Sequence, residues 1–326
     1  MNWDAEFSSG EYQHFWNLTE EENHLLLQEA PSEALSALLL YQKGQKCAEQ
    51  DDWNRAIAYF AETLALRPLW HSVWTEQAAL LLRTGETEAA IEACDRALEI
   101  TADDAAAWEL RGAALLRLQR YGAAIESCDR AVNLNPRKHL AWRTLAEAQN
   151  RLGRYSEAVV SYDKALDFQP DDAPAWGDRG KALQKLGRYE AAINSYDKLL
   201  STEPQHPKLW YARGLALRKL GRTEAAIASF QQALEIQPSF YPATRSKLFL
   251  LLTRGQRRHL TSAQRATLRN DLNNVLDSFS KTKLPGLVTI ALVALVSTHS
   301  HSIALSVSAI FLLIAIARDL LTEAQR

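Results

Sequence analysis

The sequence is poor in the residue patterns on which catalytic and metal sites depend. Its three cysteines, Cys47, Cys94 and Cys128, do not stand at metal-ligand spacing. It contains no glycine-rich phosphate loop, no nucleophile elbow and no zinc-protease helix, and its eight histidines are scattered. We therefore predict a protein that is not an enzyme and that holds no cofactor and no metal.

Charge is also missing from particular segments. Residues 1–36 contain eight carboxylates but no lysine or arginine, and residues 284–317 contain no charged residue. Residues 241–283, in contrast, carry nine basic residues against two aspartates. The net charge of the whole chain is only −2, which argues against a nucleic-acid partner. No basic region followed by an apolar run stands at the N-terminus, so no secretory signal is expected.

What the sequence does contain is a ladder of tryptophans with a period of 34 residues: Trp74, Trp108, Trp142, Trp176 and Trp210. A small residue follows each tryptophan by four positions: Ala78, Gly112, Ala146, Gly180 and Gly214. An alanine follows each tryptophan by sixteen positions: Ala90, Ala124, Ala158, Ala192 and Ala226. Proline stands near the end of most units: Pro68, Pro136, Pro170, Pro204 and Pro238. A period of this length indicates a stacked-repeat architecture.

The pattern predicts a pair of antiparallel helices in each unit. The tryptophan anchors the first helix, and the glycine or alanine one turn later lets the second helix approach closely. The alanine of the second helix serves the same purpose from the other side, and the proline ends that helix. One pair cannot bury its own apolar face, so the pairs must stack. By their place in this pattern, Cys94 and Cys128 are expected to be small core residues.

These residues resemble the tetratricopeptide repeat. The clearest copy, 173–206, has the family's residues at eight positions: Trp176, Gly180, Leu183, Gly187, Tyr189, Ala192, Tyr196 and Pro204. Six units fit, at 37–70, 71–104, 105–138, 139–172, 173–206 and 207–240. The resemblance implies an all-α fold, a right-handed superhelical solenoid of six helix pairs, and a function in protein–protein interaction. The amino-acid sequence of the units also resembles that of bacterial, especially cyanobacterial, repeat proteins.

The resemblance further implies that the first helix of each unit lines a concave groove, with positions 5, 9, 12 and 13 of each unit facing a partner. In repeats 2 and 3 the side chains at these positions form a small surface of mixed character. In repeats 4 to 6 they make up, together with the nearby Lys208 at position 2, our candidate groove: Arg143, Glu147, Asn150, Arg151, Lys181, Gln184, Lys185, Lys208, Tyr211, Arg218 and Lys219. This set is strongly basic and suits an acidic peptide. The alternative is an ordinary solvated helix face.

Residues 1–36 form an acidic, aromatic N-terminal segment in which we expect a short helix near 20–29. Ser32 is expected to cap the first helix of repeat 1. The segment either docks its aromatic residues in a groove or packs as a cap on the first repeat. Because it is acidic, it could also occupy the basic groove of its own chain and regulate partner binding. At the other end, residues 241–283 are predicted to form basic capping helices, followed after the uncharged stretch by a tail, 318–326.

The uncharged residues 284–317 divide into two halves of fifteen residues around His299–Ser302. A perpendicular membrane span needs about 20 residues. Three interpretations remain open: a helical hairpin in the membrane, a single span, or a soluble pair buried in a partner. Basic residues flank both ends, which favours a hairpin with both ends on the cytoplasmic side.

Together these features predict a membrane-tethered interaction scaffold that acts in the assembly or recruitment of a membrane complex. The repeats would lie on the cytoplasmic side of the plasma membrane or the thylakoid. The alternative is a structural subunit present in fixed stoichiometry in a membrane protein complex. Detergent extraction separates the two, since a subunit would be extracted with constant partners.

Overall fold

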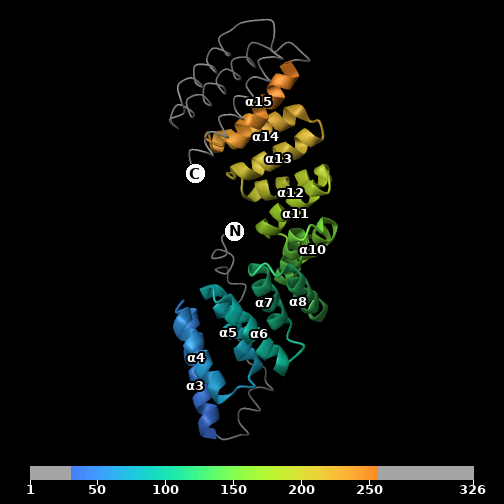
Figure 1. The fold of residues 1–326 in the computed structure, drawn as a ribbon. Coiled ribbons are helices and arrows are strands. Elements are labelled where there is room, and N and C mark those ends of the chain that lie inside the picture. Colours follow the sequence, from blue (N-terminus) through green and yellow to red (C-terminus); the bar gives the residue numbers. More distant parts are fainter. Residues whose placement is uncertain (1–30, 256–326) are drawn as a thin grey trace, which may run out of the picture. The chain divides into compact units, whose positions relative to one another are not determined.

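A computed structural model describes residues 31–255 of the chain (Figure 1). These residues form thirteen helices and no strand, so the predicted all-α class is confirmed for this part of the chain. The helices divide into two compact units, and the boundary along the sequence falls between Leu186 and Gly187. We call them the first and the second unit and describe each by itself.

The first unit contains nine helices: α3 (Pro31–Glu49), α4 (Trp53–Leu66), α5 (His71–Thr84), α6 (Thr87–Ile100), α7 (Ala105–Arg117), α8 (Tyr121–Leu134), α9 (His139–Arg151), α10 (Tyr155–Phe168) and α11 (Ala173–Lys185). The second unit contains four: α12 (Tyr189–Thr202), α13 (Pro207–Lys219), α14 (Thr223–Ile236) and α15 (Tyr241–Gly255). The starts of α5, α7, α9, α11 and α13 are 34 residues apart, as the sequence period predicts.

The helices of the first unit lie in two layers. Each repeat pairs a first helix with a second helix, as α5 pairs with α6, and each second helix packs on the next first helix, as α6 packs on α7. In addition, α5 contacts α7, and α7 contacts α9. Within this unit, no comparable contact joins α4 to α6, α6 to α8 or α8 to α10. The first helices therefore form the inner, more closely spaced layer of the stack.

The alternation of small and large residues works as the sequence predicts. A Cβ atom added to Gly112 would lie 2.4 Å from the Sγ atom of Cys128, and one added to Gly214 would lie 2.5 Å from the ring of Phe230. The alanines of the second helices are fully buried: Ala90, Ala124, Ala158, Ala192 and Ala226. Cys94 and Cys128 are also buried, and this burial raises the pKa of both thiols.

The beginning of repeat 1 differs from the expectation. Helix α3 begins at Pro31, so Ser32 lies inside its first turn and the prediction that Ser32 caps this helix is wrong. The physical reason is that proline suits the first helical position, where its missing N–H is not needed. The short helix expected near 20–29 lies outside the described residues.

At the other end of the described chain, α15 packs against α14 and covers the last repeat. The predicted membrane segment 284–317, the rest of the basic region after residue 255, and the tail 318–326 lie outside the described residues. Among the helices between Pro31 and Gly255, none is both long enough and apolar enough to cross a membrane.

Candidate partner-binding face

The candidate site is the surface that the first helices form. In the first unit this surface belongs to α5, α7, α9 and α11, and we call it the first-helix face. In the second unit the corresponding helix is α13. Positions are numbered within each repeat from its first residue, so that position 1 is residue 71, 105, 139, 173 or 207 in repeats 2 to 6.

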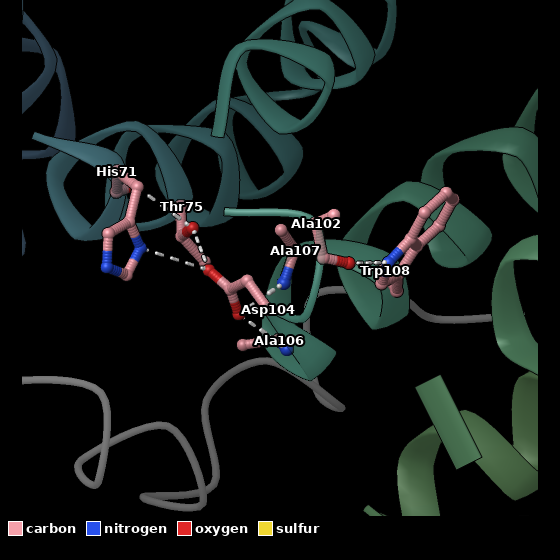
Figure 2. Close-up of polar contacts among 7 residues, drawn as sticks. All are labelled: His71, Thr75, Ala102, Asp104, Ala106, Ala107 and Trp108. Carbon is pink, nitrogen blue, oxygen red and sulfur yellow. Dashed lines mark hydrogen bonds and ion pairs between the residues drawn. The ribbon is translucent and has the colours of Figure 1, made fainter. Parts of the chain in front are cut away.

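The tryptophan ladder fixes the turn that precedes each first helix. The indole N–H of Trp108 donates a hydrogen bond of 2.8 Å to the carbonyl oxygen of Ala102, six residues earlier (Figure 2). The other four ladder tryptophans make the same bond: Trp74 to Pro68, Trp142 to Pro136, Trp176 to Pro170 and Trp210 to Pro204, at 2.8–2.9 Å. In four of the five cases the proline that follows the second helix thus also supplies the acceptor that a partly buried indole requires.

The residue at position 5, which was expected to face a partner, contacts the residue at position 34 of its own repeat. In repeat 2, the hydroxyl of Thr75 donates a hydrogen bond of 2.7 Å to Asp104 (Figure 2). Asp104 is the N-cap of α7, where it accepts from the amides of Ala106 and Ala107, and His71 Nδ1 lies 3.7 Å from its carboxylate. Burial by itself would raise the pKa of Asp104, but these contacts together lower it below its ordinary value.

The same pairing recurs with different chemistry in the next two repeats. Glu109 at position 5 forms an ion pair of 2.8 Å with Lys138. Arg143 pairs with Asp172 at 3.3 Å, and Asp172 also caps α11 through the amide of Ala175. In repeats 2 to 4, position 5 therefore links each repeat to the start of the next one. In particular, the guanidinium of Arg143 already contacts a carboxylate of its own chain.

Two further cations of the candidate groove also have carboxylate neighbours. Arg151 lies 3.0 Å from Glu147, and Lys181 lies 2.7 Å from Asp178. Partial burial alone would lower the pKa of Arg151, but Glu147 and the phenol of Tyr121 raise it above its ordinary value. Arg151 nevertheless keeps 50% of its side-chain surface exposed. The first-helix face is therefore less positive than its count of basic residues predicts.

The structure places the remaining predicted residues as follows. Asn150 and Gln184 are half-buried on α9 and α11, and Lys185 is exposed in the last turn of α11. These three lie in the first unit with Arg143, Glu147, Arg151 and Lys181. The other four belong to the second unit, on α13: Lys208, Tyr211, Arg218 and Lys219. Within residues 31–255, Lys185, Lys208, Arg218 and Lys219 have no ion pair.

Tyr211 does not stand open to a partner as position 5 was expected to do. Its ring lies 5.7 Å from the ring of Phe230 and 5.4 Å, edge to face, from that of Phe240. Phe240 is at position 34, so this pair repeats the linkage with aromatic residues.

The sequence analysis missed a second linkage between neighbouring repeats. The guanidinium of Arg111, at position 7, donates to Asp95 at 2.7 Å and to Ser127 at 2.9 Å. The two partners lie sixteen residues before and sixteen residues after the arginine. The same spacing joins Arg179 to Asp163, and Arg213 to Asp197 and Ser229. An aspartate, an arginine and a serine at intervals of sixteen form a signal that the sequence displays.

The junction between repeats 3 and 4 lacks this linkage. Position 7 of repeat 4 is Leu145, so Asp129, at the aspartate position, meets no arginine there. Partial burial and the charge of Glu157 raise the pKa of Asp129.

Stacked helix pairs with a 34-residue period define a helical-repeat protein. Tetratricopeptide repeat models match residues 41–105, 178–239 and 105–138, and a TPR repeat model matches residues 148–187. These matches cover most of residues 41–239, and the chain belongs to the tetratricopeptide repeat family. No curated protein has a detectable sequence match to the chain.

Solved structures share the fold at low sequence identity. PilF from Pseudomonas aeruginosa has a TM-score of 0.55 at 16% identity, and the match covers 66% of this chain and 97% of PilF. YrrB has a TM-score of 0.54 at 21% identity, covering 58% of this chain and 97% of YrrB. PilW has a TM-score of 0.54 at 20% identity, covering 64% of this chain and 97% of PilW. At these identities the likeness shows the fold alone.

Proposed function

We propose that this protein is a non-enzymatic scaffold that binds a segment of a protein partner along its first helices. The observation that carries the proposal is the inner layer formed by α5, α7 and α9, in which α7 contacts both α5 and α9. A layer of this kind presents side chains from several repeats to one extended partner. YrrB is described as a TPR protein with an unusual peptide-binding site, and PilW as a type IV pilus biogenesis factor. Both descriptions support a role in binding or assembly.

The partner segment that we propose is acidic. Arg151 is half-exposed, and its guanidinium carries five N–H donors, so it can bind an incoming carboxylate while it keeps Glu147. Lys185, on the neighbouring first helix α11, is exposed and has no ion pair within residues 31–255. These two residues are therefore the best candidates in the first unit for contact with an acidic partner. Arg218 and Lys219 are the corresponding candidates on α13.

We also propose that residues 284–317 tether the scaffold to a membrane, with the repeats on the cytoplasmic side. The support for the tether is the run of 34 residues without charge. A tether would confine the search for a partner to the membrane surface and raise the effective concentration. The task that suits this arrangement is the assembly or recruitment of a complex in the plasma membrane or the thylakoid.

The test is crosslinking and affinity capture from membranes with the full chain, compared with a chain that lacks 284–326. The tether predicts that the shortened chain leaves the membrane fraction and loses its partners. Capture of partners in constant stoichiometry after detergent extraction would instead support a permanent structural subunit.

The acidic-partner proposal is tested by charge reversal. Lys185→Glu combined with Lys219→Glu should abolish capture at moderate salt, because both cations are exposed and no ion pair within 31–255 is broken. Arg151→Glu is a poorer probe, since it would place a second carboxylate beside Glu147. Lys198→Glu on the second helix α12 is the matched control, because Lys198 is exposed, has no ion pair within residues 31–255 and lies on a second helix. Capture that survives the double reversal would show that the basic residues are merely solvated.

A further inference from the structure

The outer face of α3 is open at a place where the other first helices of the first unit are covered. At position 3 the residues of repeats 2 to 5 are 0% exposed: Val73, Ala107, Ala141 and Ala175. They are covered because the second helix of the preceding repeat packs there, as α4 packs on α5. In repeat 1 the same position holds Leu39, which is 49% exposed, and Leu35 one turn earlier is 58% exposed.

The open face of α3 changes in character along the helix. Leu35, Leu39, Lys43 and Lys46 follow one another at helical spacing and lie on one side of α3. Both lysines are exposed, and within residues 31–255 neither has an ion pair. In repeats 2 to 4, position 10 is instead a buried apolar residue: Leu80, Ala114 and Ala148. This face of α3 is therefore complementary to a partner segment that is apolar near the start of the helix and acidic farther along it.

The chain that leads into α3 has this composition in this order. Counted backward from Pro31, the segment first presents Leu25–Leu27 and then Glu20–Glu22. Residues 1–30 contain seven carboxylates and no lysine or arginine. A segment that returned antiparallel along α3 would place its leucines opposite Leu35 and Leu39, and its glutamates opposite the two lysines.

We propose that residues 1–30 fold back along α3 and cover the side on which a second helix packs in the later repeats of the first unit. Leu25–Leu27 pack on the two exposed leucines of α3, and Glu20–Glu22 pair with Lys43 and Lys46. This inference does not depend on the proposed function. It assigns the acidic segment to closing the open end of the repeat stack, and not to filling the basic first-helix face.

The test is limited proteolysis of the full chain with chymotrypsin, which cleaves after large apolar residues and can cut at Leu25–Leu27 only when these residues leave α3. Leu35→Ser combined with Leu39→Ser should release the segment and speed this cleavage about tenfold or more, since cleavage follows the population of the open form. Both leucines are substantially exposed, so the double variant should fold, as circular dichroism will verify. Leu152→Ser, at a leucine that is 45% exposed in the turn after α9, is the matched control. An unchanged rate in the double variant overturns the proposal.

The charged half of the contact has its own test. Lys43→Glu combined with Lys46→Glu should also speed cleavage, and Glu21→Lys combined with Glu22→Lys should restore protection in that background. Absence of this rescue overturns the assigned pairing.

Two other occupants give distinct results. If Arg151→Glu and Lys185→Glu release the segment while the leucine variant does not, the segment occupies the first-helix face. If the wild-type chain dimerises in sedimentation and the leucine variant abolishes the dimer without changing cleavage, a second copy covers α3. Either result overturns the proposal.

Discussion

Replacing Asp104 by alanine should lower the free energy of unfolding by about 2–3 kcal/mol. The loss has two sources. The carboxylate caps α7 by accepting from the amides of Ala106 and Ala107, and removal of such a cap costs about 1 kcal/mol. It also accepts a 2.7 Å hydrogen bond from Thr75, and a bond to a charged group contributes about 1.5–3 kcal/mol. The lower end applies, because the Thr75 hydroxyl can turn to the carbonyl oxygen of His71 at 3.2 Å.

Asp104→Asn separates the capping of α7 from the effect of the negative charge of Asp104. Asparagine keeps one oxygen, which can still accept from the amides of Ala106 and Ala107, but its amide nitrogen replaces the oxygen that accepts from Thr75. Because the Thr75 hydroxyl can donate to the carbonyl oxygen of His71 instead, the expected loss is about 1 kcal/mol. The pKa of Asp104 is lowered in the folded state, so the charge stabilises the protein above the unfolded pKa of about 3.9. This stabilisation is lost as the pH falls through the folded pKa. The difference between the wild type and Asp104→Asn should therefore be complete at pH 7 and vanish in strong acid.

The assay is urea unfolding of the full chain, followed by circular dichroism, with hydrogen exchange at the start of α7 as a local measurement. A local measurement is needed because repeat arrays can unfold in parts. Exchange of the Ala106 and Ala107 amides should accelerate strongly in the alanine variant and weakly in the asparagine variant. Equal effects of the two substitutions would refute the assignment of Asp104 as a cap.

Three further predictions concern other features of the fold. Gly214→Ala should lower the urea midpoint of unfolding, because the new Cβ would lie 2.5 Å from the ring of Phe230. Such overpacking costs about 1–3 kcal/mol, which exceeds the gain of about 1 kcal/mol in helix propensity. Adding Phe230→Leu to this variant should restore the midpoint. Asp129→Asn should raise the melting temperature at pH 7, because partial burial and the charge of Glu157 disfavour the ionised carboxylate and raise the pKa of Asp129. The gain should disappear below about pH 4, where the aspartate is protonated in both the folded and the unfolded chain. Trp176→Phe should cost about 0.5–1.5 kcal/mol in urea unfolding, through loss of the indole hydrogen bond.

The helix pairs could be predicted from the sequence because their packing is local to each repeat. The contact between Gly112 and Cys128 joins two residues sixteen apart, inside one repeat, and the same spacing joins Gly44 to Phe60 and Gly214 to Phe230. A recurring size pattern of this kind has few structural solutions, and the start of α7 at Ala105 falls where the period places it. The start of α3 was missed because Ser32 was taken as its N-cap, whereas Pro31 already suits the first helical position.

The charge of the first-helix face could not be predicted in the same way. The sequence analysis counted positions 5, 9, 12 and 13, but the carboxylates that pair with the cations also lie elsewhere. Asp172, which pairs with Arg143, is at position 34, and Asp178, which pairs with Lys181, is at position 6. A charge count over chosen positions describes a surface only when its neighbours in space are also known.

The linkage at position 7 was overlooked for a different reason. Arg111 stands among variable residues, since the same position holds Gln77 and Leu145 in other repeats. Its partners Asp95 and Ser127 become visible only when all three positions are compared together. Where the arginine is missing, the aspartate and serine positions alone do not show that the linkage is broken.

The pairs between positions 5 and 34 suggest how nearly equal repeats stack in one order. Five of the six repeats make such a pair, with aromatic, hydroxyl–carboxylate or charged partners: Tyr41 with Trp70, Thr75 with Asp104, Glu109 with Lys138, Arg143 with Asp172, and Tyr211 with Phe240. Repeat arrays risk pairing with the wrong neighbour during folding. A stack in the wrong order would bring Glu109 against an aspartate or Arg143 against a lysine, in positions where the carboxylates are almost buried. Like charges at such a site cost several kcal/mol, so the varied pairs stabilise the native order and oppose the alternatives.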